Sequence, residues 1–142
     1  ELFLRLKDSY AELFSHAGVL FRTTNLLLFE HVHLPMEYRQ NLYLIFKEAL
    51  NNSLRHSGCR EIELSVALRG RHLEVVLKDD GRGFDPGELE GRGDGLENMR
   101  RRASRIGGSL DIDSAPERGT AVAFSGPLAS GAGGLSGAGG GA

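Results

Sequence analysis

Two alternating segments joined by a short turn constrain the fold of this chain most. Apolar residues occupy every second position across residues 61–69, and again across residues 72–79. Gly70-Arg71 lies between the two runs. A period of two with a short glycine-containing connection is typical of a β-hairpin with one buried face. The second run ends in Asp79-Asp80-Gly81-Arg82-Gly83, so a glycine-rich loop is expected to leave the sheet at this point.

Further strands and helices are expected around this hairpin. Helical spacing of apolar residues predicts helices over residues 2–16, 36–56 and 96–106. Alternation predicts three more strands, over residues 19–25, 109–115 and 120–124, with residues 30–34 as a short connector. The order α-β-α-β-β-α-β-β predicts an α/β two-layer sandwich, a mixed β-sheet of about five strands with about three helices packed on one face.

Composition narrows the class of protein. The chain has 142 residues, 40% of them hydrophobic and 25% charged, which suits one globular domain. Its net charge of −2 does not favour nucleic acid as a partner. A single cysteine, Cys59, excludes an intramolecular disulfide and a Cys-rich metal site, which fits a reducing, cytoplasmic setting. Apolar runs such as residues 26–29 are too short to span a bilayer.

The two ends of the chain differ from its middle. Glu1 lies inside a helical pattern with no initiating Met, which predicts a fragment of a longer protein. From Ala129 onward only Gly, Ala, Ser and one Leu occur. Such a composition buries too little apolar surface to offset chain entropy. We therefore expect a folded domain over residues 1–128 and a flexible tail over residues 129–142.

The longest predicted helix carries an unusual polar stripe. Glu48, Asn52 and Arg55 gather opposite an apolar stripe made of Leu42, Ile45, Phe46, Ala49, Leu50 and Ser53. Any amphipathic helix has such a stripe, but Asn is a poor helix former and Asn51-Asn52 lies in mid-helix. The neutral oxygen of an Asn suits a Mg²⁺ ion that keeps most of its waters and bridges phosphates.

Two glycine clusters come after the hairpin. An Asp at the end of a strand can accept a hydrogen bond from an exocyclic amine, and the glycines after it let the backbone lie against a flat ring. A second cluster, Gly91, Gly93 and Gly95, precedes a helix, where backbone amides form an anion site. A plain Asp-Gly turn and a flexible loop are the simpler alternatives. The chain contains no Walker motif, so phosphates would be held by this other arrangement.

Taken in order, four segments resemble the ATP-binding boxes of the GHKL superfamily. Residues 46–57 resemble the N-box, with the sequence Phe-Lys-Glu-Ala-Leu-Asn-Asn-Ser-Leu-Arg-His-Ser. Asp79-x-Gly81-x-Gly83, residues 93–103 and Gly119-Thr120 resemble the first, second and third glycine boxes. The form Gly-Leu-x-x-Met-Arg-x-Arg-Ala is similar to sensor histidine kinases of the NarX/DesK type. The resemblance covers about residues 2–128 and implies the Bergerat fold and a protein-histidine kinase catalytic domain.

For the adenine end of the nucleotide, the resemblance implies roles for four residues. Asp79 would receive the adenine amino group of ATP, and Thr120 would support that contact. The pocket floor would be shaped by Gly81 and Gly83.

At the phosphate end, the resemblance implies that Asn52 coordinates Mg²⁺ and that Arg55 faces the phosphates, with His56 beside the nucleotide. Backbone amides would hold the phosphates, from Gly93, Gly95 and Leu96. Glu48 matches a residue that activates water in ATP-hydrolysing relatives. In a kinase, where hydrolysis is avoided, an alternative role for it is to orient the waters of Mg²⁺.

The resemblance implies a phospho-acceptor histidine that is followed by Asp or Glu, and no such histidine is expected within this chain. Each of its five histidines is followed by a residue other than Asp or Glu, namely Ala17, Val32, Leu34, Ser57 and Leu73. The resemblance therefore implies a histidine-containing dimerisation domain of the same dimeric protein, which could be membrane-anchored, and a response regulator. The alternative is a stand-alone GHKL switch protein, an anti-sigma-factor-like serine kinase. A degenerate binding module is a third hypothesis, against which four intact boxes argue.

Overall fold

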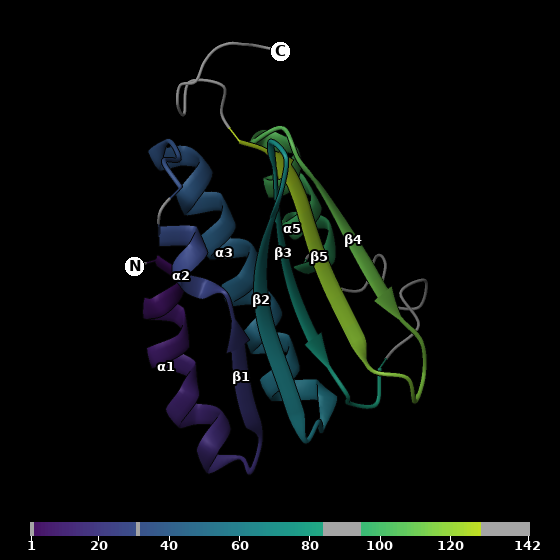
Figure 1. Ribbon diagram of the computed structural model, residues 1–142. Helices are drawn as coiled ribbons and strands as arrows, with labels where there is room; N and C mark the ends of the chain where they lie inside the picture. The colour runs from purple at the N-terminus through teal and green to yellow at the C-terminus, as the bar shows by residue number, and fades with distance from the viewer. Residues whose placement is uncertain (1, 31, 84–94, 129–142) are drawn as a thin grey trace.

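The structure is a computed structural model that describes residues 2–30, 32–83 and 95–128. A five-stranded mixed sheet, covered by helices on one face, forms the body of the molecule (Figure 1). The strands are β1 (Leu20–Thr24), β2 (Glu61–Arg69), β3 (His72–Asp79), β4 (Ser109–Ser114) and β5 (Thr120–Pro127). They lie in the order β1-β2-β3-β5-β4. The β1–β2 pair is parallel and the other pairs are antiparallel. This confirms the predicted fold class.

The helical layer contains one element that the sequence did not predict. Its members are α1 (Leu2–His16), α2 (Leu26–Glu30), α3 (Met36–Asn52), a π-helical turn η1 (Ser53–Ser57) and α5 (Gly95–Arg105). The short α2 adds to the three expected helices. It follows Asn25, which has a positive φ of 62°, and it buries Leu26 and Phe29 at a spacing of three. Five residues are too few for that period to be recognised in a sequence.

Two predicted boundaries differ from the structure by three residues or more, whereas the others that moved shifted by one. The helix expected over residues 36–56 is α-helical only to Asn52 and continues as η1. The last strand was expected to stop at Phe124, before Gly126 and Pro127. It continues to Pro127, since these residues pair with the beginning of β3 at Leu73 and His72.

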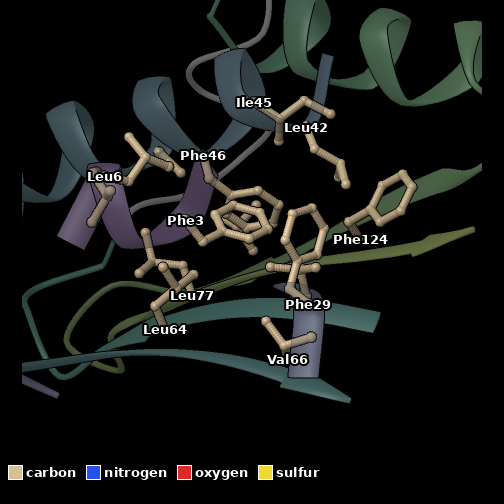
Figure 2. Packing of buried hydrophobic residues seen from close by; sticks show 14 of the residues in the cluster. Phe3, Leu6, Phe29, Leu42, Ile45, Phe46, Leu64, Val66, Leu77 and Phe124 are labelled. Atoms are coloured by element: carbon tan, nitrogen blue, oxygen red, sulfur yellow. The ribbon is translucent and has the colours of Figure 1, made fainter. Parts of the chain in front are cut away.

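A single hydrophobic core fills the space between the layers (Figure 2). Phe3 of α1 is at its centre, with its ring centroid 4.5 Å from that of Phe29 and 5.9 Å from that of Phe46. Along β2 and β3, buried and partly exposed residues alternate, as expected for strands with one covered face. In the described part of the chain, no helix has the length and apolar character needed to cross a membrane. The tail expected over residues 129–142 lies outside the described residues.

The fold brings the ends of two central elements together. Asp79 is the last residue of β3, where it pairs with Ile62 of β2 and with Thr120 of β5. Ser53, directly after α3, is hydrogen-bonded to Asp79. The segment resembling the N-box and the first glycine box therefore meet at one edge of the molecule.

Truncation of the core should be costly on α3. Phe46 is fully buried, so Phe46→Ala should lower the free energy of unfolding by about 3–5 kcal/mol through lost burial and a cavity. Met36, on the same helix, is 71% exposed, and Met36→Ala should change it by less than about 0.5 kcal/mol. Urea unfolding of both variants measures the difference. Similar losses for the two would contradict the packing described here.

Candidate functional site

The most unusual polar group in the chain is the carboxylate of Asp79, which is only 6% exposed. Ser53 Oγ donates a hydrogen bond to Asp79 Oδ2 at 2.8 Å. The backbone N–H of Gly81 donates to Asp79 Oδ1 at 2.9 Å. Each carboxylate oxygen can accept more than one hydrogen bond. The result is an oriented acceptor at the end of β3 with capacity for a further donor.

The π-helical turn places Ser53 against this carboxylate. Ser53 begins η1 and Gly58 ends it with a left-handed φ of 61°. Single π-turns occur often at functional sites, because the wider turn redirects side chains. Sequence reasoning missed Ser53, which it counted among the apolar positions. A hydroxyl in an apolar stripe was the available signal, since a buried hydroxyl needs a partner.

Thr120 lies next to Asp79 in the sheet, as its pairing partner on β5. Thr120 Oγ1 is 2.8 Å from Ser114 Oγ, and Ser114 Oγ also donates to the carbonyl oxygen of Gly119 at 3.1 Å. Ser114 was expected in the strand over residues 109–115 but was not a candidate site residue. A row of hydroxyl groups therefore borders the acidic acceptor on the β4–β5 side.

Close backbone contacts explain two of the glycines. A Cβ at Gly119, where φ is 78°, would lie 2.4 Å from the carbonyl oxygen of Asp79. A Cβ at Gly83, where φ is 66°, would lie 2.1 Å from the carbonyl oxygen of Ala115. Both positions combine positive φ with contacts shorter than real Cβ atoms make. These glycines let the loop after β3 lie directly on the β4–β5 turn.

A cavity of about 420 Å³ lies between α3 and α5. Its lining residues are Leu44, Lys47, Glu48, Asn51, Gly95, Asn98, Met99 and Arg102. A Cβ at Gly95 would lie 3.0 Å from Glu48 Oε2, so the N-terminus of α5 lies against the Glu48 side chain. Backbone amides at a helix N-terminus attract anions. Together with Lys47 and Arg102, they make this cavity suited to a negatively charged ligand.

The predicted residues fall into two adjoining groups. Asp79, Gly81, Gly83 and Thr120 meet at the end of β3. Glu48 and Gly95 line the cavity, and half-buried Leu96 follows Gly95 and packs against the core. Asn52 ends α3 and Arg55 lies on η1, between the two groups, and Arg55 Nη2 donates to Asn52 Oδ1 at 3.2 Å. Gly93 and the side chain of His56 lie outside the described residues.

Sequence reasoning also missed residues in the cavity. Lys47 and Asn51 line it, although neither was a candidate. Arg102, on the helix expected over residues 96–106, is partly buried and also lines the cavity. Its Nη1 lies 3.5 Å from Asn41 Oδ1. Over residues 2–30, 32–83 and 95–128, no three His, Cys, Asp or Glu side chains group together as a metal site.

Asp80 fastens the glycine loop to the neighbouring strand. Its Oδ1 accepts hydrogen bonds from the backbone N–H groups of Arg60, at 2.8 Å, and Glu61, at 3.0 Å. These bonds, that from Glu61 first, lower the pKa of the Asp80 carboxyl below its usual value. The second Asp of the loop therefore has a structural role, distinct from that of Asp79.

The fold and site define an ATP-binding domain, and comparison with known proteins gives its family. Residues 37–130 match the family described as histidine kinase-, DNA gyrase B-, and HSP90-like ATPase. This match covers more than half of the chain, and the chain belongs to that family. It is a catalytic ATP-binding domain of the sensor histidine kinase type, as the sequence resemblance predicted.

The matched relatives are sensor proteins. The chain is 33% identical over 99 residues to the sensor protein VraS of Staphylococcus saprophyticus, covering 70% of this chain and 28% of that protein. It is 34% identical over 94 residues to VraS of Staphylococcus aureus, covering 66% and 27%. The chain thus spans less than a third of these relatives.

Solved structures show the same fold. The histidine kinase domain of the blue-light activated histidine kinase from Erythrobacter litoralis EL346 superposes with a TM-score of 0.72 at 21% identity, covering 89% of this chain and 61% of that one. Histidine kinase AdeS of Acinetobacter baumannii has a TM-score of 0.71 at 10% identity, covering 90% and 64%.

The Asp80 contacts should make stability depend on acid pH. Because the folded pKa of Asp80 lies below the unfolded value of 3.8, its contribution is present above that value and is lost as pH falls through the folded pKa. Asp80→Asn should therefore lower the free energy of unfolding near pH 7, and its difference from wild type should shrink below about pH 4. Urea unfolding at several pH values tests this. Asp113→Asn, on exposed β4, is the control, and a pH-independent Asp80→Asn difference would contradict the assignment.

Proposed function

We propose that this domain binds ATP with Mg²⁺ and delivers the γ-phosphate to a histidine on a separate dimerisation domain, for relay to a response regulator. The observation that carries the proposal is the buried Asp79 carboxylate, held by Ser53 and Gly81 at the end of β3. An oriented acceptor of this kind, beside a cavity with cationic walls, suits a ligand with an amine at one end and phosphates at the other.

Asp79 would select adenine. The exocyclic amine of adenine is a donor, and the carboxylate is an acceptor. Guanine carries a carbonyl oxygen at the matching position, so two acceptors would face each other. Thr120, paired with Asp79 across the sheet, would support the contact through its hydroxyl. Gly81 contributes through the backbone N–H that orients the carboxylate, and Gly83 through the close passage of the loop.

The cavity between α3 and α5 fits the phosphates. Lys47 and Arg102 supply positive charge, and the α5 N-terminus supplies amides at Gly95 and Leu96. We place Gly93 and His56 at the same end of the nucleotide on the strength of the sequence resemblance. Bound Mg²⁺ would neutralise phosphate charge and orient the transferred group.

We propose that Asn52 is the residue of this chain that holds Mg²⁺. Its Oδ1 accepts a hydrogen bond from Arg55, whose side chain is exposed and free to turn toward a phosphate. Metal and guanidinium thus compete for one oxygen. Glu48, against the α5 N-terminus, would orient metal-bound waters and keep the γ-phosphate aligned for transfer.

The acceptor histidine would come from elsewhere in the full protein. The histidines of this chain lack the acidic neighbour of the expected acceptor. The matches to longer sensor proteins support a dimerisation domain of the same protein and a response regulator as partners. They favour this function over the stand-alone switch.

Asp79→Asn should weaken adenine nucleotide binding by about tenfold or more. One acceptor oxygen becomes an NH₂ donor, which faces the adenine amine or the Ser53 hydroxyl unfavourably. Calorimetric titration with ADP measures the loss, with Asp113→Asn on β4 as the control. Equal ADP affinity in wild type and Asp79→Asn would remove Asp79 from the site.

Asn52→Ala should act through the metal. We expect ATP affinity in EDTA to change less than about twofold, while the gain in affinity on adding Mg²⁺ shrinks by about tenfold, because one neutral ligand is lost. Titrations with and without Mg²⁺ separate the two effects. Gln40→Ala, exposed on the same helix, is the control. An unchanged Mg²⁺ gain in Asn52→Ala would show that another group holds the ion.

A further inference from the structure

A hydrogen bond from α1 reaches the wall of the cavity. Tyr10 Oη donates to Asn51 Oδ1 at 2.5 Å, joining residues 41 positions apart. Tyr10 is only 6% exposed, so its phenol depends on a partner within the protein. Asn51 lines the cavity between α3 and α5, and Tyr10, on α1, is not among its lining residues. The sequence motifs assigned no ligand contact to either residue.

This contact decides which end of the Asn51 amide is available to a ligand. A carboxamide has one acceptor oxygen and one NH₂ donor group. An unrestrained amide can present either end. With Oδ1 held by Tyr10, the polar group that Asn51 has left for the cavity is Nδ2, a donor. The hydrogen bond therefore makes Asn51 a donor to whatever the cavity holds.

The Tyr10 phenol remains a donor at physiological pH. Burial raises the pKa of Tyr10 above its usual value, and nearby Tyr43 and Glu48 raise it further. The hydrogen bond to Asn51 and the charge of Arg55 act in the opposite direction but do not reverse the shift. The orientation of Asn51 is thus maintained throughout the range in which a kinase works.

A neutral donor is chemically useful at this position. Glu48 lines the same cavity and repels an anion, while Lys47 and Arg102 attract one. An amide N–H donates a hydrogen bond to a phosphate oxygen without adding another charged side chain to the cavity. Asn51 and Asn52 would then act with opposite polarity, the first through its NH₂ group toward phosphate and the second through its oxygen toward metal.

We propose that Asn51 donates a hydrogen bond to a phosphate of the bound nucleotide, and that Tyr10 is the positioning residue that holds it in the donating orientation. This inference rests on the proposed nucleotide-binding function. It extends the phosphate site to α1, an element outside the matched family segment of residues 37–130.

The test compares adenosine with ADP, because their difference isolates the phosphates. Asn51→Asp keeps an oxygen for Tyr10 and replaces the NH₂ donor by an oxygen of similar size. Calorimetry in EDTA should show wild-type-like adenosine affinity and a preference for ADP over adenosine that falls at least about tenfold. Asn98→Asp places the same charge on the α5 wall of the cavity. Its ADP preference should fall by no more than about twofold to threefold.

Asn51→Ala and Tyr10→Phe complete the series. Asn51→Ala removes the donor without adding charge, and its ADP preference should also fall, by about fivefold. Tyr10→Phe leaves Asn51 intact but unrestrained, so we expect a loss of about threefold with unchanged adenosine affinity. Tyr38→Phe is the matched control, because the Tyr38 hydroxyl donates to the carbonyl oxygen of Pro127, away from the cavity. It should keep the full ADP preference.

The outcomes separate this inference from the function on which it rests. If Asn51→Asp and Asn98→Asp lose the preference for ADP over adenosine equally, the added negative charge alone explains the loss, and the role of Asn51 is overturned. A wild-type ADP preference in Tyr10→Phe would overturn the positioning role. If wild type binds adenosine and ADP but Asn51→Ala is unaffected, the inference fails alone. If wild type binds neither, the proposed function fails and this inference with it.

Discussion

The hydrogen bond between Ser53 and Asp79 is the contact on which the site depends. A carboxylate buried at the end of a strand is costly unless donors compensate it. Here the donors come from two directions, a hydroxyl at the end of the long helix and an amide in the loop after the strand. The same pair of bonds satisfies the charge, joins the helical layer to the sheet and aims the acceptor. In the proposed function, the structure and the recognition of adenine therefore depend on the same atoms.

Local patterns predicted most of the fold, because each strand shows its buried face in its own sequence. Residues 61–69 and 72–79 became β2 and β3 with the predicted bounds. The failures lie where the structure depends on distant partners. The C-terminal extension of β5 exists because the beginning of β3 offers it a pairing edge. The π-turn η1 breaks the 100° periodicity after Asn52, so a helical wheel drawn through residue 56 misplaces the residues of that turn.

The site was predicted as far as a linear motif can reach. Asp79, Thr120, Glu48 and Gly95 became candidates from the sequence because they belong to segments with recognisable spacing. Ser53 and the Tyr10–Asn51 pair did not, because each makes its contact between distant segments of the chain. Ser114 did not because it belongs to no motif, although its partner Thr120 is close in the sequence. No spacing rule connects residues 10 and 51. Side chains that orient a functional group thus leave weaker traces in sequence than the group itself.

The tight passage of the backbone at Gly83 and Gly119 bears on how such sequences diverge. The Cβ that each glycine lacks would collide with a neighbouring main-chain oxygen, whether or not a nucleotide is present. A descendant that lost ATP would still need both glycines to fold, whereas position 79 would need only an oxygen that accepts the Ser53 hydrogen bond, such as that of Asn. The presence of Gly83 and Gly119 thus reflects the backbone geometry of the fold. Asp79, at the end of β3, is the position at which loss of the ligand would first become visible in a sequence.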